Sequence, residues 1–298
     1  MIDTPSSANS NNERPPSHNF VLFNPARGTR YYAVVPLNQG GFGWVWSGTT
    51  AEGLPIAIKI FKPSDDFRKD FHSWFTEQEI CLRCLQHQYI VTTYDQFYSP
   101  PHGFVIVMEE ASGSLADVLR LAGPQRPFTI CHVGCHILLA LHYIHNLGVV
   151  HRDVSLNNIL LFPPSLFKLA DFGISRQGVG IGEYARTFIG RRSHIPPELL
   201  TAGYTTHQSD IYQLGIVLLS LLTGTMPIPD DASVETTARM IREGVPRQTA
   251  EALIPTHGRL AQILSMMLRR RAQWRYQSAE AVYTEMYALL EELLPTTQ

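Results

Sequence analysis

The sequence has no excess of charge of either sign. Its 298 residues carry 24 Lys and Arg against 26 Asp and Glu, a formal net charge of −2 at pH 7. Proteins that hold nucleic acid or anionic lipid over a broad surface need a large positive field, so that class is not indicated. Function must therefore come from a local site, and we expect no nucleic-acid partner.

Cysteine is also scarce. The four cysteines fall as two pairs, Cys81 with Cys84 and Cys131 with Cys135, which is too few for a disulfide scaffold. Histidines close to the pairs would suggest zinc, namely His87, His132 and His136. We favour packing of the thiols in a hydrophobic core over a zinc site. Both pairs lie in segments with helical apolar spacing, where buried thiols pack as small hydrophobic groups.

Long apolar runs are missing as well. The longest, IYQLGIVLLSLLTG, is interrupted by Gln213 and is shorter than the about 20 residues that a membrane-spanning helix needs. The start of the chain, MIDTPSSANSNNERPPSHNF, has no apolar segment typical of a secretory signal. We therefore expect no membrane span and a cytoplasmic location.

The residues that are present predict an α+β fold with two lobes. Residues 1–19 are rich in Ser, Asn and Pro, which predicts a disordered tail. From about residue 28 to residue 110, the short runs YYAVV, IAIKIF and FVIVM are typical of strands, with one helical segment from about Asp70 to Gln86. From residue 111 to about residue 295 the apolar spacing is helical. Residues 20–298 are thus expected to form a small β-rich lobe and a larger helical lobe, with a hinge at Glu109 to Gly113.

Three helices of the second lobe are predicted in detail. One has its apolar face at Val133, Ile137, Ala140, Leu141, Ile144 and Leu147 and stops at Gly148. The segment SDIYQLGIVLLSLL is apolar nearly all round and should lie at the centre of the lobe. The last helix begins after Ser278 as N-cap and runs to Pro295. The run from Arg269 to Arg271 is interpreted as the solvated face of a helix.

Three motifs suggest a nucleotide site. LNQGGFGWVW is a glycine-rich turn between β-rich runs, and such turns let backbone N–H groups approach an anion, although a plain hairpin turn has the same sequence signature. Lys59 interrupts the apolar run IAIKIF, and a half-buried ammonium needs an anionic partner, for which a phosphate is one candidate. Asp171, in KLADFGISR, and Asn158 offer the oxygen ligands that Mg²⁺ prefers.

A fourth motif, VVHRDVSLNNILL, contains His151, Arg152, Asp153 and Asn158. Together, in this order and at this spacing, the motifs resemble those of the eukaryotic-type protein kinases over about Tyr31 to Leu294. The resemblance implies a bilobal kinase fold in which Asp153 accepts the proton of the substrate hydroxyl and Lys59 holds the α- and β-phosphates of ATP. Asn158 and Asp171 would hold Mg²⁺, with Mn²⁺ as an alternative.

The same resemblance implies the remaining nucleotide contacts. They are Leu37, Gly40, Gly41 and Gly43 in the glycine-rich segment; Val45, Ala57 and Leu160 around the adenine ring; Met108, Glu109 and Ala111 along its edge; and Asp117 near the ribose. It also pairs Glu198 with Arg275 and makes Asp210 the acid that supports the catalytic loop.

The implied activity is transfer of the γ-phosphate of Mg-ATP to Ser or Thr hydroxyls of protein substrates. Control by phosphorylation of the activation segment is expected, with Thr187 as the main acceptor, Tyr184 and Ser175 as weaker ones, and self-association for autophosphorylation. A pseudokinase that binds nucleotide and acts as a scaffold is the alternative from a different class. Tyrosine or dual specificity is less favoured.

The sequence departs from the kinase pattern at four places. Asn38 replaces the first loop glycine, and Gln78 stands where an acid should pair with Lys59, with Glu77 and Glu79 on either side. Ser155 replaces a lysine of the catalytic loop, and Arg191 replaces a threonine of the activation segment. We hypothesise that Arg191, or its neighbour Arg192, supplies the positive charge that Ser155 lacks, since a guanidinium binds phosphate through two hydrogen bonds.

Overall fold

The computed structural model describes residues 19–40, 43–61, 86–100, 102–172 and 192–294. The chain divides into two compact units, one of residues 1–71 and 93–110 and one of residues 72–92 and 111–298. The expected hinge, Glu109 to Gly113, contains the division between Glu110 and Ala111. Each unit has a hydrophobic core of its own.

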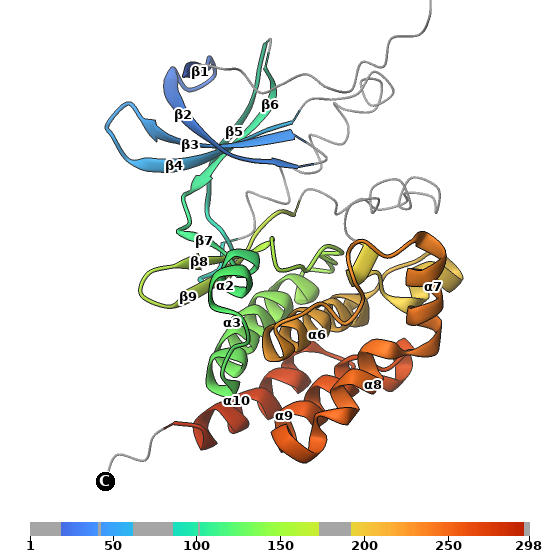
Figure 1. Ribbon diagram of the computed structural model, residues 1–298. Coiled ribbons are helices and arrows are strands. Elements are labelled where there is room, and N and C mark those ends of the chain that lie inside the picture. The colour runs from blue at the N-terminus through green and yellow to red at the C-terminus, as the bar shows by residue number, and fades with distance from the viewer. Residues whose placement is uncertain (1–18, 41–42, 62–85, 101, 173–191, 295–298) are drawn as a thin grey trace, which may run out of the picture. The chain divides into compact units, whose positions relative to one another are not determined.

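The first unit is a six-stranded antiparallel sheet in the order β1-β2-β3-β4-β6-β5 (Figure 1). Its strands are β1 (Phe20–Asn24), β2 (Thr29–Gly40), β3 (Gly43–Thr50), β4 (Pro55–Phe61), β5 (Thr93–Ser99) and β6 (Gly103–Glu109). Alternate residues of β3 and β4, including Trp44, Trp46 and Ile58, enter the core, as the two-residue period of a strand requires. The strands predicted from YYAVV, IAIKIF and FVIVM are confirmed.

Asp95 of β5 joins the two ends of this strand order. One of its carboxylate oxygens, Oδ2, accepts hydrogen bonds from Asn24 Nδ2 at 2.8 Å and from the Tyr31 hydroxyl at 2.7 Å. Asp95 and Asn24 are both buried. The outermost strands of the sheet are therefore tied to each other through side chains rather than left as separate edges.

The second unit is mostly helical and has a small sheet in the order β7-β8-β9. Its elements are β7 (Gly113–Ser114), α2 (Leu115–Ala122), α3 (Pro127–Asn146), β8 (Ile159–Phe162), β9 (Leu166–Leu169), η3 (Arg192–His194), α5 (Pro197–Ala202), α6 (His207–Thr223), α7 (Val234–Glu243), α8 (Val245–Ala252), α9 (Ile254–Met267), η4 (Ala272–Trp274) and α10 (Ala279–Glu292). Within this unit, α3 packs against α6 and α10 (Figure 1).

The positions of these helices agree with the prediction from the sequence, but two details of the prediction are wrong. Helix α6 is buried from Ser209 to Leu222, as its apolar composition predicts, and Ser278 caps α10 by accepting the Ala281 N–H. Leu147 was expected on the buried face of α3, but it lies beyond the last turn of that helix and is 51% exposed. The run from Arg269 to Arg271 is not a helix face: it lies in the turn between α9 and η4.

Helix α3 has 20 residues and a mean hydropathy of 1.4 over its most apolar window, which is long and apolar enough to cross a membrane by length and composition. In the structure 56% of that window is buried inside the protein, where α3 contacts α6, α10 and β9. The same composition is what a core helix of a folded domain requires.

Cys131, Cys135 and His136 of α3 pack against other groups of the second unit. Cys131 and Cys135 are buried, and burial raises the pKa of each thiol to about 12. The His136 ring stacks on Tyr89, with centroids 4.3 Å apart, and its Nδ1 accepts the Phe167 N–H at 3.2 Å. Cys81 and Cys84 lie outside the described residues.

His136 should make the stability of the protein depend on pH. Burial, and then the neighbouring His132, lower the pKa of His136 to about 4, against about 6.5 in an unfolded chain. Because the unfolded chain binds the proton more readily, the contribution of His136 to the free energy of unfolding is fully present above pH 6.5. It is lost as the pH falls toward 4. After a discount for partial exposure, we expect a loss of about 1–2 kcal/mol.

The measurement is the free energy of urea unfolding at pH 7 and pH 4.5, for the wild type and for His136→Asn. Asn keeps an acceptor oxygen near the position of Nδ1 but does not titrate in this range. The variant should lose less stability on acidification than the wild type. An identical pH dependence in both proteins would contradict the assignment to His136.

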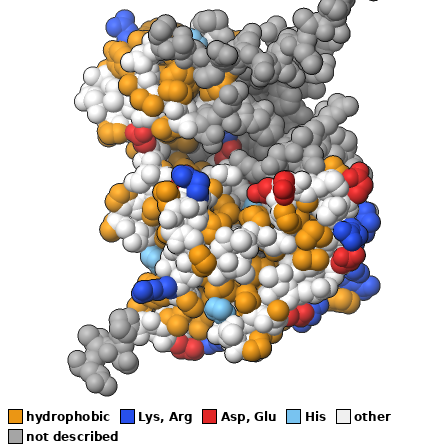
Figure 2. All heavy atoms as spheres, in the orientation of Figure 1, with side chains coloured by type: hydrophobic (Ala, Val, Ile, Leu, Met, Phe, Trp, Pro, Cys, Tyr) orange, Lys and Arg blue, Asp and Glu red, His pale blue; other side chains and the backbone are white. Residues whose placement is uncertain are grey.

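Basic and acidic side chains are mixed on the surface of the second unit. Figure 2 shows them as neighbours near α7 and α8 on the face that it draws. On that face no extended area of one sign is seen among the described residues, in agreement with the balanced composition.

Candidate active site

A buried loop follows α3 and leads into β8. His151, Asp153, Ser155 and Asn158 are each between 0% and 6% exposed, although polar side chains are costly to bury without partners. The backbone of the loop is held by α6, where Asp210 accepts the N–H groups of His151 at 2.9 Å and Arg152 at 2.7 Å. The expected role of Asp210 in supporting this loop is confirmed.

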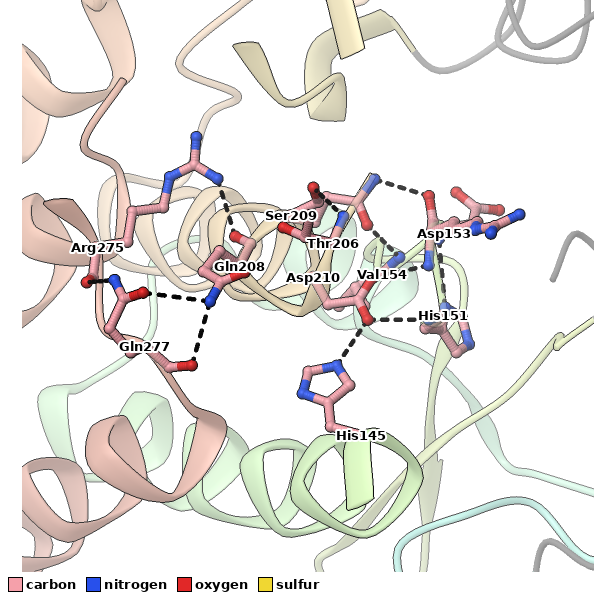
Figure 3. A network of polar contacts seen from close by, with 12 residues as sticks. His145, His151, Asp153, Val154, Thr206, Gln208, Ser209, Asp210, Arg275 and Gln277 are labelled. Atoms are coloured by element: carbon pink, nitrogen blue, oxygen red, sulfur yellow. Dashed lines mark hydrogen bonds and ion pairs between the residues drawn. The ribbon is translucent and has the colours of Figure 1, made fainter. Parts of the chain in front are cut away.

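Asp210 has a third partner, which the sequence did not indicate. His145, near the end of α3, donates from Nε2 to Asp210 Oδ2 at 2.8 Å (Figure 3). The His145 ring also stacks on His207 at the start of α6, with centroids 4.1 Å apart. A fully buried carboxylate is thus satisfied by two backbone donors and one imidazole.

Asp153 is held within the loop by Asn158. The Asn158 amide nitrogen donates to Asp153 Oδ2 at 2.8 Å and to the Asp153 carbonyl at 2.9 Å. His151 Nδ1 accepts the Asp153 N–H at 3.3 Å, so the ring proton is on Nε2, which donates to the Ala170 carbonyl at 3.1 Å. Two residues that the sequence analysis assigned to the site, Asp153 and Asn158, are therefore in direct contact.

Asn158 and Asp171 are brought toward each other by the β8–β9 pairing. The Ala170 N–H donates to the Asn158 carbonyl at 2.8 Å, and Asp171 follows directly. Asp171 has φ = 67°, a left-handed conformation that is uncommon for a residue with a side chain. An amide and a carboxylate oxygen fit Mg²⁺, which is held by few protein ligands together with substrate phosphates.

The described residues contain no group of three or more His, Cys, Asp or Glu arranged to hold a metal ion.

In the first unit, the predicted nucleotide contacts share one face of the sheet. Val45 of β3 lies opposite Lys59 of β4, and Ala57 of β4 lies opposite Met108 of β6. Since side chains alternate along a strand, these four point away from the core that Trp46 and Ile58 fill. Lys59 Nζ lies 4.6 Å from the centroid of the Phe61 ring.

The described part of the glycine-rich segment ends β2 at Gly40 and begins β3 at Gly43. Gly40 pairs with Gly43, and Gly41 lies outside the described residues. Gly43 has φ = 149°, and a Cβ atom there would collide with the carbonyl oxygen of Ile60, so only glycine fits. Leu37, at an irregularity of β2, is 53% exposed.

The remaining predicted contacts lie at or after the division between the units. Glu109 ends β6 and Ala111 begins the next segment, while Leu160 of β8 pairs with Ser114. Asp117 is part of the N-cap of α2: its Oδ2 accepts the Ser114 N–H at 3.0 Å. A hydrogen bond from Arg120, and then those from Ser114, lower the pKa of Asp117.

The expected pair of Glu198 and Arg275 is confirmed and buried. The guanidinium contacts both carboxylate oxygens, at 2.8 Å and 2.7 Å, and Ser209 Oγ donates to Glu198 at 2.6 Å. Burial opposes the ionisation of Glu198, but the hydrogen bonds and charge of Arg275 outweigh it, so the pKa of Glu198 is lowered. The carboxylate is therefore charged at neutral pH.

Some predictions fall outside the described residues. They concern the partner of Lys59 (Gln78, Glu77 or Glu79), the cation at Arg191, and the modification sites Thr187, Tyr184 and Ser175. Gln213 and His145, by contrast, contact the loop or its support and had no assigned role in the sequence. The one available signal was that Gln213 interrupts an apolar run.

The sequence matches the protein kinase domain family over residues 31–288. It is 27% identical over 268 residues to serine/threonine-protein kinase PknL of Mycobacterium tuberculosis, which covers 89% of this chain and 67% of PknL. It is 29% identical over 219 residues to serine/threonine-protein kinases drp72 of Corynebacterium efficiens, covering 71% of this chain and 42% of that protein.

Among solved structures, the fold is similar to that of Rad53 1-466 in complex with AMP-PNP. The TM-score is 0.70 at 24% identity, and the match covers 84% of this chain and 62% of Rad53 1-466. At that identity the likeness concerns the fold. The chain spans between 42% and 67% of the three proteins named here.

Proposed function

Because this chain belongs to the protein kinase domain family, we propose that it transfers the γ-phosphate of Mg-ATP to serine and threonine hydroxyls of protein substrates. The observation that carries the proposal is the buried loop in which Asp153 is bonded to Asn158 and supported by Asp210. The proposal of serine and threonine as acceptors is supported by the similarity to proteins that are named serine/threonine-protein kinases.

Asp153 is the group that would orient the substrate hydroxyl and accept its proton. The carboxylate is fixed by Asn158 Nδ2, so little reorientation is needed when a hydroxyl arrives. Asn158 uses its amide nitrogen for Asp153 and would present its oxygen, together with Asp171, to Mg²⁺ or Mn²⁺. The metal would neutralise charge on the transferring phosphate.

The residues of the first unit would bind the nucleotide. Lys59 would hold the α- and β-phosphates, and Val45, Ala57 and Met108 would contact the base from the same face of the sheet. The glycine segment Gly40, Gly41 and Gly43 would approach the phosphates through backbone N–H groups. Further contacts in the proposal are Leu37, Glu109, Ala111, Asp117 and Leu160.

Two further parts of the proposal fall outside the described residues. Arg191 would supply the cation that Ser155 does not provide, in keeping with the complete burial of Ser155. Phosphate on Thr187, placed there by a second copy of the chain, would form charge-assisted hydrogen bonds with Arg152 and raise activity.

The test is an assay of the full chain with radiolabelled Mg-ATP and dephosphorylated casein. We expect phosphoserine and phosphothreonine, transfer that stops when EDTA removes the metal, and a phosphorylated Thr187 in mass spectra of the active protein. Binding of ATP without any transfer would indicate a scaffold instead. Label on tyrosine alone would overturn the proposed specificity.

A further inference from the structure

Gln213 is a polar residue at the centre of an apolar helix. It lies in α6 between Tyr212 and Leu214, and its exposure is 0%. A buried amide is destabilising unless its donor and its acceptor both find partners. The partners of Gln213 therefore indicate why the position is polar.

Both partners belong to the candidate catalytic loop. Gln213 Oε1 accepts the Val154 N–H at 3.1 Å, and Gln213 Nε2 donates to the Arg152 carbonyl at 2.8 Å. These two backbone groups immediately flank Asp153 in the chain. One planar amide thus holds the peptide units on both sides of Asp153, which restricts the direction of its side chain.

The backbone at this point needs such support. Arg152 has φ = 72°, a left-handed conformation that is unfavourable for a residue with a Cβ atom. Its N–H is bound by Asp210 and its carbonyl by Gln213. Asp210 and Gln213 are three residues apart on α6, so they lie on the same face of the helix.

We infer that Gln213 is a positioning residue for phosphoryl transfer, which aims Asp153 at the substrate hydroxyl through the backbone on either side of it. The inference rests on the proposed function, in which Asp153 accepts the proton. Gln213 would act with Asp210, but on different groups: Asp210 binds two N–H groups before Asp153, whereas Gln213 spans Asp153 itself.

The first test is Gln213→Met, which keeps the length of the side chain and removes both hydrogen-bonding groups. A displacement of a catalytic group by about 1 Å can lower turnover about 100-fold, and we expect kcat to fall about 10- to 100-fold. The KM for ATP should stay within about twofold, because Gln213 contacts only the loop backbone. Gln213→Asn keeps both groups on a shorter arm and should give a smaller loss of kcat.

The matched control is Ser220→Ala. Ser220 is also fully buried in α6, but its hydroxyl donates within the helix to the Ile216 carbonyl and does not contact the loop. All variants are assayed below the onset of their own thermal unfolding. If both Gln213 variants keep the kcat of Ser220→Ala, the inference is overturned. If Gln213→Met does not fold, the comparison uses Gln213→Asn alone: a kcat below that of Ser220→Ala supports the inference, and an equal kcat overturns it.

A double variant separates positioning from a general loss of structure. If Gln213 acts through Asp153, then Gln213→Met should reduce the residual activity of Asp153→Asn by no more than about twofold, since groups that act as a unit are not additive. A full additional loss would contradict the inference. A wild type whose transfer does not depend on Asp153 would instead overturn the proposed function itself.

Discussion

Asp153→Asn should lower kcat by about 10²- to 10⁴-fold, the range by which a positioned general base accelerates a reaction. The variant keeps the shape of the side chain, and its amide oxygen can still accept the hydrogen bond from Asn158 Nδ2. The loop should therefore remain folded and the KM for ATP nearly unchanged. The loss would report the missing base alone.

The measurement is steady-state transfer from radiolabelled Mg-ATP, with the melting temperature recorded for each protein. Asp95→Asn is the matched control, because it also converts a buried carboxylate to an amide, but in the first unit, where Asp95 binds Asn24 and Tyr31. We expect the control to keep kcat within about twofold. If Asp153→Asn kept more than a tenth of wild-type turnover, Asp153 would not be the base.

The largest expected loss of stability follows removal of Arg275. In Arg275→Met the carboxylate of Glu198, 6% exposed, would lose both of its guanidinium contacts. Removing one partner of a buried ion pair lowers the free energy of unfolding by about 3–5 kcal/mol, because a charge stays buried without compensation. Arg275 also donates to the Arg269 carbonyl, so the turn before η4 should loosen as well.

This prediction is tested with a double-variant cycle and urea unfolding. Glu198→Gln combined with Arg275→Met should recover part of the stability lost in Arg275→Met alone, since no buried charge remains. Arg259 and Glu292 provide the control: they are 2.7 Å apart but 41% and 59% exposed, and Arg259→Met should cost about 0–1 kcal/mol. Equal losses for Arg275→Met and Arg259→Met would show that burial does not decide the strength of the pair.

Local patterns predicted the elements of both units and the order of the motifs. Strands β3, β4 and β6 alternate or are continuously apolar, and α6 is apolar all round, so their identity depends only on neighbours in the sequence. Leu147 was misassigned because helical spacing continues past the last residue that is actually in the helix. The end of a helix depends on its capping interactions, and the spacing of apolar residues does not locate these to within one residue.

Contacts between residues far apart in the sequence were harder to predict. The contact of Glu198 with Arg275 spans 77 residues, and that of Asp210 with the loop spans about 59. Both were expected only from the resemblance to a family, because local patterns carry no information over such separations. Nothing in the sequence paired His145 with Asp210. The run from Arg269 to Arg271 was read as a helix face because charge patterns do not reveal that carbonyls of the turn bind Arg275.

By itself, the sequence determined which side chains the proposed phosphoryl transfer would use, because the identities of Lys59, Asp153, Asn158 and Asp171 do not depend on the fold. Tertiary structure decided how the described part of the catalytic loop is held. The conformation of Arg152 and the direction of Asp153 depend on Asp210 and Gln213, about 60 residues later in the chain. Hydrogen bonds depend on distance in space, and only folding brings α6 against that loop.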